Sequence, residues 1–236
     1  MGVLGIDTAG PVVGAAWVSP NGVQTWSQRV TRKADRVLLP AIAELLKAAD
    51  AEAAGGIDLI AVSVGPGAFT GLRVGVSAAL GVAFARALPV VAVSSLAARA
   101  MMARDGRTFA VLDARKGKVY AGVYNAIPDV PDLIGEEADA VLRDILPDAP
   151  FVAVGEGAIT FREEIRAAGG LVSPDADRCP ADEVARLGAR LRGQAMDAGA
   201  IALRYLRAPD ARVPQDIGRT VGKPQPPSSN LGGERE

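Results

Sequence analysis

Histidine is absent from this sequence, and cysteine occurs only once, at Cys179. Without histidine, the Ser-His and Cys-His pairs that activate a nucleophile cannot be built. Zinc sites usually take histidine or cysteine ligands, so only hard, oxygen-bound cations such as magnesium remain possible. A single cysteine cannot form a disulfide within the chain, which suits a reducing cytoplasm.

The sequence also has no excess of one charge and no long apolar run. Its 26 basic and 27 acidic residues give a net charge of −1, which provides no overall field for holding nucleic acid or an anionic membrane. The uncharged windows 74–85 and 87–98 are far shorter than the roughly 20 residues that a membrane span needs. Asp7 interrupts the N-terminal apolar run before a signal sequence could form. We therefore expect a cytoplasmic protein that reaches nucleic acid only through a partner.

What is present is enough apolar chain for a folded core, since 49% of the 236 residues are hydrophobic. Apolar runs alternate with turn and helix signals in the order typical of an α/β protein. Strands are predicted at residues 1–6, 12–18, 23–30, 57–64, 89–94 and 151–154. Helices are predicted at 35–49, 72–86, 95–103, 159–168 and 181–192, while 198–206 fits either a helix or extended chain.

The second half of the chain repeats the beginning. With an offset of 106, Asp7 aligns with Asp113, and each lies in a strand-turn-strand pattern. This pattern predicts two related α/β halves, each with a mixed sheet flanked by helices. We place the N-terminal half at 1–105, the C-terminal half at 106–208 and a disordered tail, poor in apolar residues, at 209–236.

A glycine-rich loop is the first candidate binding site. Residues 65–71 read Gly-Pro-Gly-Ala-Phe-Thr-Gly between a strand and a helix, where free N–H groups and the helix dipole favour an anion. A Walker A loop is excluded because Gly71 is followed by Leu72 and Arg73. A dinucleotide-binding loop fits poorly because Thr70 stands where it needs glycine. The alternative is a structural loop that packs the helix tightly against the sheet.

The two aspartates that align in the repeat are the second candidate site. In two-domain nucleotide-binding folds of the actin, Hsp70 and sugar-kinase type, such turns meet phosphate or its magnesium from the two sides of a cleft. Alternatively, each aspartate caps its own turn by side-chain to backbone hydrogen bonds. The candidate nucleotide-binding residues are Asp7, Thr8, Gly65, Gly67, Thr70, Gly71, Asp113 and Arg115.

Two predicted helices carry more apolar or small surface than one core requires. The apolar residues of helix 35–49 sweep an arc of roughly 200°, about twice the width that a helix covering one core needs. Helix 72–86 continues a stripe of small residues at spacing four, which lets another backbone come close, either in this chain or in a partner. The candidate partner-interface residues are Val37, Leu38, Leu39, Ile42, Leu46, Gly71, Gly75, Ala79 and Ala83.

Five motifs together resemble the TsaB family, also known as YeaZ. They are Gly5-Ile6-Asp7-Thr8-Ala9, the segments 64–75 and 112–120, Val93-Ser94-Ser95-Leu96 and Tyr205-Leu206-Arg207. The resemblance implies the actin-like ATPase fold and a noncatalytic subunit in the formation of threonylcarbamoyladenosine on tRNA. Its implied partners are TsaD, which transfers the threonylcarbamoyl group to the adenosine beside the anticodon, and the ATPase TsaE. TsaD holds its metal with two histidines, which this chain lacks, so neither a metal of its own nor the proteolysis suggested by the label glycoprotease-like is expected.

The resemblance also implies how the chain assembles. Family members pair through the first two helices, with themselves when alone and with TsaD when it is present, so tRNA is contacted only indirectly. ATP or ADP with magnesium is expected only at the boundary between subunits. Many members carry a histidine before Leu38-Leu39-Pro40, where this chain has Ala34 or a neighbour, which puts polar contacts there in doubt. The alternatives are an autonomous ATPase or small-molecule kinase of the same fold and a Rossmann-type oxidoreductase.

Overall fold

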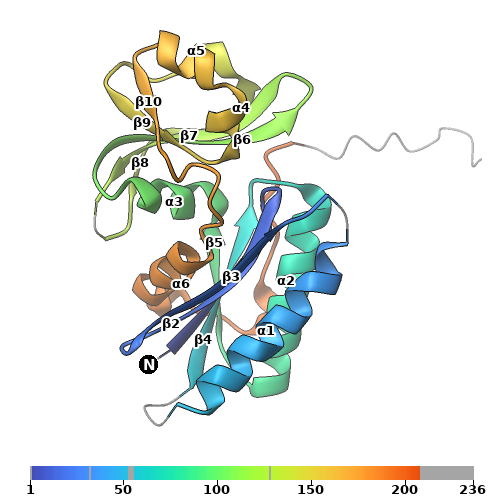
Figure 1. The fold of residues 1–236 in the computed structure, drawn as a ribbon. Helices are drawn as coiled ribbons and strands as arrows, with labels where there is room; N and C mark the ends of the chain where they lie inside the picture. The colour runs from blue at the N-terminus through green and yellow to red at the C-terminus, as the bar shows by residue number, and fades with distance from the viewer. Residues whose placement is uncertain (1, 32, 53–55, 128, 208–236) are drawn as a thin grey trace, which may run out of the picture.

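The computed structural model describes residues 2–31, 33–52, 56–127 and 129–207. Two five-stranded sheets lie one above the other, with helices around and between them (Figure 1). The N-terminal sheet has the order β3-β2-β1-β4-β5, and the C-terminal sheet has the order β8-β7-β6-β9-β10. The N-terminal strands are β1 (Gly2–Asp7), β2 (Val12–Ser19), β3 (Gly22–Arg29), β4 (Ile57–Gly65) and β5 (Val90–Ser94). The C-terminal strands are β6 (Gly106–Arg115), β7 (Lys118–Ala126), β8 (Asp132–Val141), β9 (Phe151–Val154) and β10 (Gly170–Val172).

Helices connect the strands in both halves. The α-helices are α1 (Ala34–Asp50), α2 (Phe69–Arg86), α3 (Ser95–Ala100), α4 (Glu156–Thr160), α5 (Arg162–Ala167) and α6 (Ala181–Arg190). Short 3-10 helices are η1 (Met101–Ala103), η2 (Leu142–Asp144), η3 (Arg192–Gln194) and η4 (Ala198–Ala200).

The two halves share one topology. In each, the first strand pairs antiparallel with the second, the second pairs antiparallel with the third, and the remaining pairs are parallel. Strands β1 to β5 therefore correspond in order to β6 to β10. The predicted pair of related α/β halves with mixed sheets is confirmed. Antiparallel pairs in both sheets disagree with the Rossmann alternative, which needs a mostly parallel sheet.

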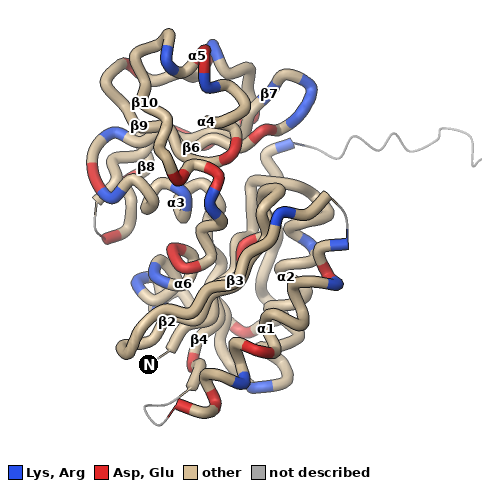
Figure 2. The backbone as a smooth tube through the Cα atoms, in the orientation of Figure 1, with Lys and Arg blue, Asp and Glu red and all other residues tan. Residues whose placement is uncertain are grey.

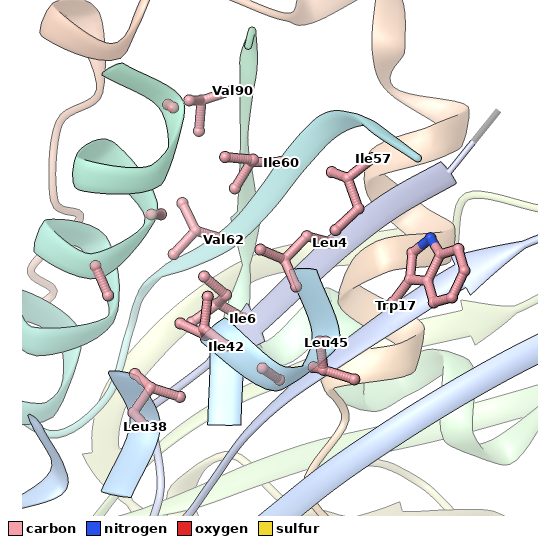
Figure 3. Packing of buried hydrophobic residues seen from close by; sticks show 14 of the residues in the cluster. Leu4, Ile6, Trp17, Leu38, Ile42, Leu45, Ile57, Ile60, Val62 and Val90 are labelled. Carbon is pink, nitrogen blue, oxygen red and sulfur yellow. The ribbon is translucent and has the colours of Figure 1, made fainter. Parts of the chain in front are cut away.

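Alternating side chains of the N-terminal strands feed two different cores. Leu4 and Ile6 point to one face of the sheet, where they pack against α1 and α2 (Figure 3). Val3 points to the opposite face, toward α6. Because successive side chains alternate across a strand, a strand that is apolar at almost every position is covered on both faces. The N-terminal sheet is accordingly the middle of three layers.

Helices α3 and α6 lie between the two sheets and connect the halves. α3 contacts β6 and β7 as well as β4 and β5, and α6 packs against β1, β2 and β4. Glycines allow α6 to come this close: a Cβ on Gly5 would lie 2.1 Å from the Ala181 carbonyl oxygen, and one on Gly188 would lie 2.3 Å from the Ala61 Cβ. Although α6 belongs to the range 106–208, it therefore completes the N-terminal core.

Several elements differ from the predicted ones. Helix α2 begins at Phe69, three residues before the predicted start, so it includes part of the glycine loop. The helix predicted at 159–168 is two short helices, because Phe161 leaves the helical region with φ −111° and ψ 34°. Strands β8 and β10 were missed: Gly135 has φ +80° within the charged β8, and β10 has only 3 residues. The predicted tail at 209–236 lies outside the described residues.

Candidate functional site

A cleft of about 1000 Å³ opens between the two halves, beside the ends of β1 and β6. Both first turns and the glycine loop contribute to its walls, as the repeat predicts. Six of the eight candidate nucleotide-binding residues line it: Thr8, Gly67, Thr70, Gly71, Asp113 and Arg115. Asp7 and Gly65 lie behind the wall.

Asp7 is completely buried and is held by Arg99 of α3. The two guanidinium nitrogens donate to the two carboxylate oxygens, with Nη2–Oδ2 at 3.0 Å and Nη1–Oδ1 at 3.3 Å. Nη1 also donates to the Ser95 carbonyl at 2.9 Å. Burial is the largest influence and acts to lower the pKa of Arg99, but the charges of Asp7 and Glu156 and the hydrogen bonds to Asp7 together outweigh it and keep this pKa above its usual range. Asp7 therefore lies in an ion pair within the protein, and sequence reasoning missed its partner.

Asp113, the repeat equivalent of Asp7, caps its own turn. Its Oδ1 accepts a hydrogen bond from the backbone N–H of Arg115 at 2.7 Å. Arg115 and Lys116 have φ of 63° and 56° and Gly117 has φ of 72°, so the capped turn is left-handed. The Arg115 side chain is 83% exposed, and its Nη1 lies 3.8 Å from Asp113 Oδ2. The turn-capping interpretation therefore holds for Asp113.

The glycines of the loop 65–71 permit close backbone packing. A Cβ on Gly67 would lie 2.6 Å from the Ala9 carbonyl oxygen, and one on Gly71 would lie 2.3 Å from the Thr8 carbonyl oxygen. The N–H of Ala68 donates to the same Ala9 carbonyl at 2.8 Å. Glycine is needed here because the β1–β2 turn fills the space that a side chain would take. The structural interpretation of the loop is therefore satisfied, while the first turn of α2 still faces the cleft.

A second loop of the same form lies across the cleft. Gly155-Glu156-Gly157 follows β9 as Gly65-Pro66-Gly67 follows β4, and Gly155 and Gly65 both have positive φ, +95° and +123°. Burial raises the pKa of Glu156 to about 7, although Arg99 acts to lower it. Glu156 lines the cleft, and sequence reasoning missed it as a site residue. Extending the repeat from the first turn to the glycine loop would have found it.

The segment that precedes the tail closes one side of the cleft. The N–H of Arg204 donates to the Val64 carbonyl at 2.8 Å, and its guanidinium donates to buried Glu137 of β8 at 2.5 Å. Arg207 forms two 2.8 Å hydrogen bonds with Asp139. The segment thus ties the N-terminal glycine loop to the C-terminal sheet, and it contains the Tyr205-Leu206-Arg207 motif.

The sequence of this chain is similar to those of known proteins. The family model described as "TsaD: tRNA N6-adenosine threonylcarbamoyltransferase" matches residues 27–165. A Bacillus subtilis protein named tRNA threonylcarbamoyladenosine biosynthesis protein TsaB is 30% identical over 225 residues, which cover 90% of this chain and 97% of that protein. The chain belongs to the TsaB family. The TsaB of Escherichia coli is 33% identical over 147 residues, or 61% of this chain and 63% of that one.

The solved structure of YeaZ from Pseudomonas aeruginosa has the same fold. It superposes with a TM-score of 0.75 at 30% identity and covers 87% of this chain and 99% of its own. Together with the repeated sheet topology, this TsaB-family neighbour confirms the predicted actin-like ATPase fold.

The predicted partner interface divides into a buried part and an exposed part. The residues that face this chain's own core are Leu38, Ile42, Gly75, Ala79 and Ala83. A Cβ on Gly75 would lie 2.2 Å from Thr8 Oγ1, so the small-residue stripe lets α2 approach the β1–β2 turn rather than face outward. Val37 and Leu46 are partly buried, and Gly71 lines the cleft. Of the predicted set, Leu39 presents the most apolar surface, with 51% exposed.

The outward face of the two helices carries other apolar groups. Phe84 is 88% exposed, and no heavy atom lies within 4 Å of a Cβ placed on Gly81. A groove of about 350 Å³ lies beside α1 and α2 and is lined by residues that include Leu39 and Arg73. At its end the Arg73 guanidinium lies 3.9 Å from the centre of the Phe69 ring. We call the outward side of α1 and α2, with Leu39, Gly81 and Phe84, the outer helix face.

The described residues contain neither a metal-binding cluster nor a membrane-spanning helix. Within 2–31, 33–52, 56–127 and 129–207, no group of three or more acidic or cysteine side chains is placed to hold a metal. In the same ranges no helix has both the length and the apolar character needed to cross a membrane.

Proposed function

We propose that this TsaB-family chain is a noncatalytic subunit in the formation of threonylcarbamoyladenosine on tRNA, acting in the cytoplasm with TsaD-like and TsaE-like proteins. The names of its relatives and of the matching family model support the pathway. The observation that supports a noncatalytic role is the engagement of both candidate aspartates: Asp7 is buried against Arg99, and Asp113 caps its own turn. Phosphoryl transfer needs such groups available to the phosphates or their metal.

The outer helix face supports a role as a binding partner. A helix that is apolar on all sides normally has both faces covered, and exposed apolar patches commonly mark protein interfaces. α2 is apolar on its inner side and also exposes Phe84 on its outer side. We propose that a TsaD-like protein covers this face in the complex and that a second copy of the chain covers it otherwise.

Contact with tRNA is proposed to be indirect. Acidic and basic side chains are interspersed over both halves (Figure 2), and the net charge is −1. In this view, the described residues show no basic patch of the kind that supplies most nonspecific affinity for nucleic acid. Binding of ATP or ADP at the subunit boundary stays a prediction.

The test uses cells depleted of this chain and rescued with variants, with threonylcarbamoyladenosine in tRNA quantified by mass spectrometry. Wild type should restore the modification. Gly81→Glu should not, because a charge on the outer helix face opposes an apolar interface while the open space at Gly81 leaves the fold intact. Gly193→Glu is the matched control: Gly193 is also exposed with open space around its Cβ position, and this variant should rescue fully.

Two results would contradict the proposal. Unchanged modification after depletion would remove the chain from the pathway. ATP hydrolysis by the purified chain alone, at a rate that its partners do not increase, would favour the autonomous ATPase or kinase.

A further inference from the structure

Buried beneath the floor of the cleft, one cation lies between carboxylates from the two halves. Asp7 comes from the end of β1, Arg99 from α3, and Glu156 from the start of α4. A Cβ placed on Gly10 would lie 3.2 Å from both Arg99 Nη2 and Glu156 Oε2, so the two side chains converge on one point. The stem of Arg99 also reaches the second glycine loop, where its Cδ lies 3.4 Å from the Cβ position of Gly155.

Folds of this kind imply magnesium with a nucleotide in the cleft, and the residues at the floor do not fit that ion. A hard cation binds to carboxylate oxygens that have free lone pairs. Both oxygens of Asp7 already accept hydrogen bonds from Arg99, at 3.0 and 3.3 Å, and Arg99 is only 3% exposed. The cation position beside Asp7 is therefore filled by the protein itself.

We propose that the Arg99 guanidinium takes the place of a divalent cation between Asp7 and Glu156, and that it thereby excludes magnesium from the cleft and holds the two halves together without a ligand. This inference goes beyond the proposed function, because it concerns the cleft whether or not the chain acts on tRNA. A guanidinium suits this role because it stays charged at any ordinary pH and its planar fork matches a carboxylate.

The surroundings of the cluster explain why a permanent charge is needed there. Without a cation, two carboxylates so near each other would repel and one would take up a proton. The other group beside them is Cys179, whose Sγ lies 4.0 Å from the Asp7 carbonyl oxygen, and burial raises the pKa of its thiol so that it stays neutral. Arg99 is therefore the positive charge that balances Asp7 and Glu156.

The experiment measures Mn²⁺ binding to the full chain at pH 7.5, with free Mn²⁺ counted by electron paramagnetic resonance. Wild type should have no Mn²⁺ site that the Asp7→Asn substitution removes. Arg99→Met should gain one Mn²⁺ site, which binds at least about tenfold more tightly than any site of the wild type. Mn²⁺ prefers carboxylate oxygens, and the carboxylates of Asp7 and Glu156 become available when the guanidinium is removed. Arg99→Lys should not gain this site, since it keeps a positive charge beside Asp7. Asp7→Asn/Arg99→Met should lose the gained site, which locates it at Asp7.

A folding readout covers the case in which Arg99→Met is unfolded. Binding to the folded state alone stabilises it, so millimolar Mn²⁺ should then restore the native circular dichroism spectrum, and chelation should abolish it. The proposal is overturned if folded Arg99→Met protein binds Mn²⁺ no better than wild type does. It is also overturned if Arg99→Met protein is unfolded and Mn²⁺ fails to restore its fold. A wild-type Mn²⁺ site that the Asp7→Asn substitution removes would overturn it as well.

Discussion

Asp7 and Asp113 occupy equivalent places in the two halves, yet their surroundings give them different tasks. Asp7 is completely buried and its carboxylate is shared with Arg99, whereas the Asp113 side chain is 23% exposed and caps its own turn. The difference arises because α3 crosses from the N-terminal half and places a guanidinium beside β1, while the turn after β6 points into the open cleft. Two positions that are equivalent in the repeated backbone can therefore hold the same residue type in different roles.

The two glycine loops show the same contrast. Gly65-Pro66-Gly67 leads into α2, which has 18 residues and an exposed apolar face, and Gly155-Glu156-Gly157 leads into α4, which has 5 residues. One loop therefore supports a long surface helix that suits a partner, and the other places a carboxylate at the cleft floor.

The largest expected difference is between the two aspartates. Asp7→Asn should lower the free energy of unfolding by about 3–5 kcal/mol, because it leaves the buried Arg99 charge without its partner. Asp113→Asn should cost only about 0.5–1 kcal/mol, because the amide oxygen can still cap an exposed turn. Urea denaturation of both variants measures the difference. Equal losses would mean that the Asp7–Arg99 pair contributes no more than a turn cap.

A smaller effect separates the glycines that pack closely from those that do not. Gly67→Ala should destabilise the protein by about 1–3 kcal/mol, because its Cβ would lie 2.6 Å from a backbone oxygen that cannot move aside cheaply. Gly81→Ala on the outer helix face should instead stabilise it by about 0.5–1 kcal/mol, since alanine is a better helix former than glycine. Melting temperatures of the two variants should shift in opposite directions, and a shared direction would contradict this account.

A third effect concerns pH and Glu156. The pKa of this carboxyl is raised to about 7 in the folded protein, above its usual value of 4.5, so the unfolded chain releases the proton first as pH rises. Stability therefore falls between about pH 4.5 and 7, by up to about 3 kcal/mol, because one unit of pKa difference is worth about 1.4 kcal/mol. Glu156→Gln removes this loss, so its advantage over wild type should grow across that window and level off above it. Parallel stability curves from pH 4.5 to 8 would show that Glu156 does not titrate in this way.

Local patterns were sufficient for most of the fold. Apolar runs predicted six strands that the structure contains, and the alignment of Asp7 with Asp113 predicted the repeated topology. Strand β8 was missed because its charged residues and Gly135 hide the alternation that marks a strand.

The site was harder to predict because its contacts are distant in the sequence. Arg99 is 92 residues from Asp7, and sequence reasoning placed it only within a helix. Local chemistry allowed two interpretations of the glycines and of both aspartates, and only burial and neighbours distinguish them. For the same reason, the sequence could not tell whether the small-residue stripe of α2 packs within this chain or against a partner. The contact of Gly75 with Thr8 shows that it packs within this chain.

The position of α6 has a consequence for the order in which the molecule can fold. The apolar side chains Val3, Leu59 and Ala61 are covered by Val184 and Leu187, which the ribosome adds more than a hundred residues later. The N-terminal half thus emerges with one face of its sheet covered only in part, by α3 and η1, until α6 is synthesised. A fragment that stops at residue 105 would keep the rest of that face exposed and aggregate, since bare apolar surface drives association.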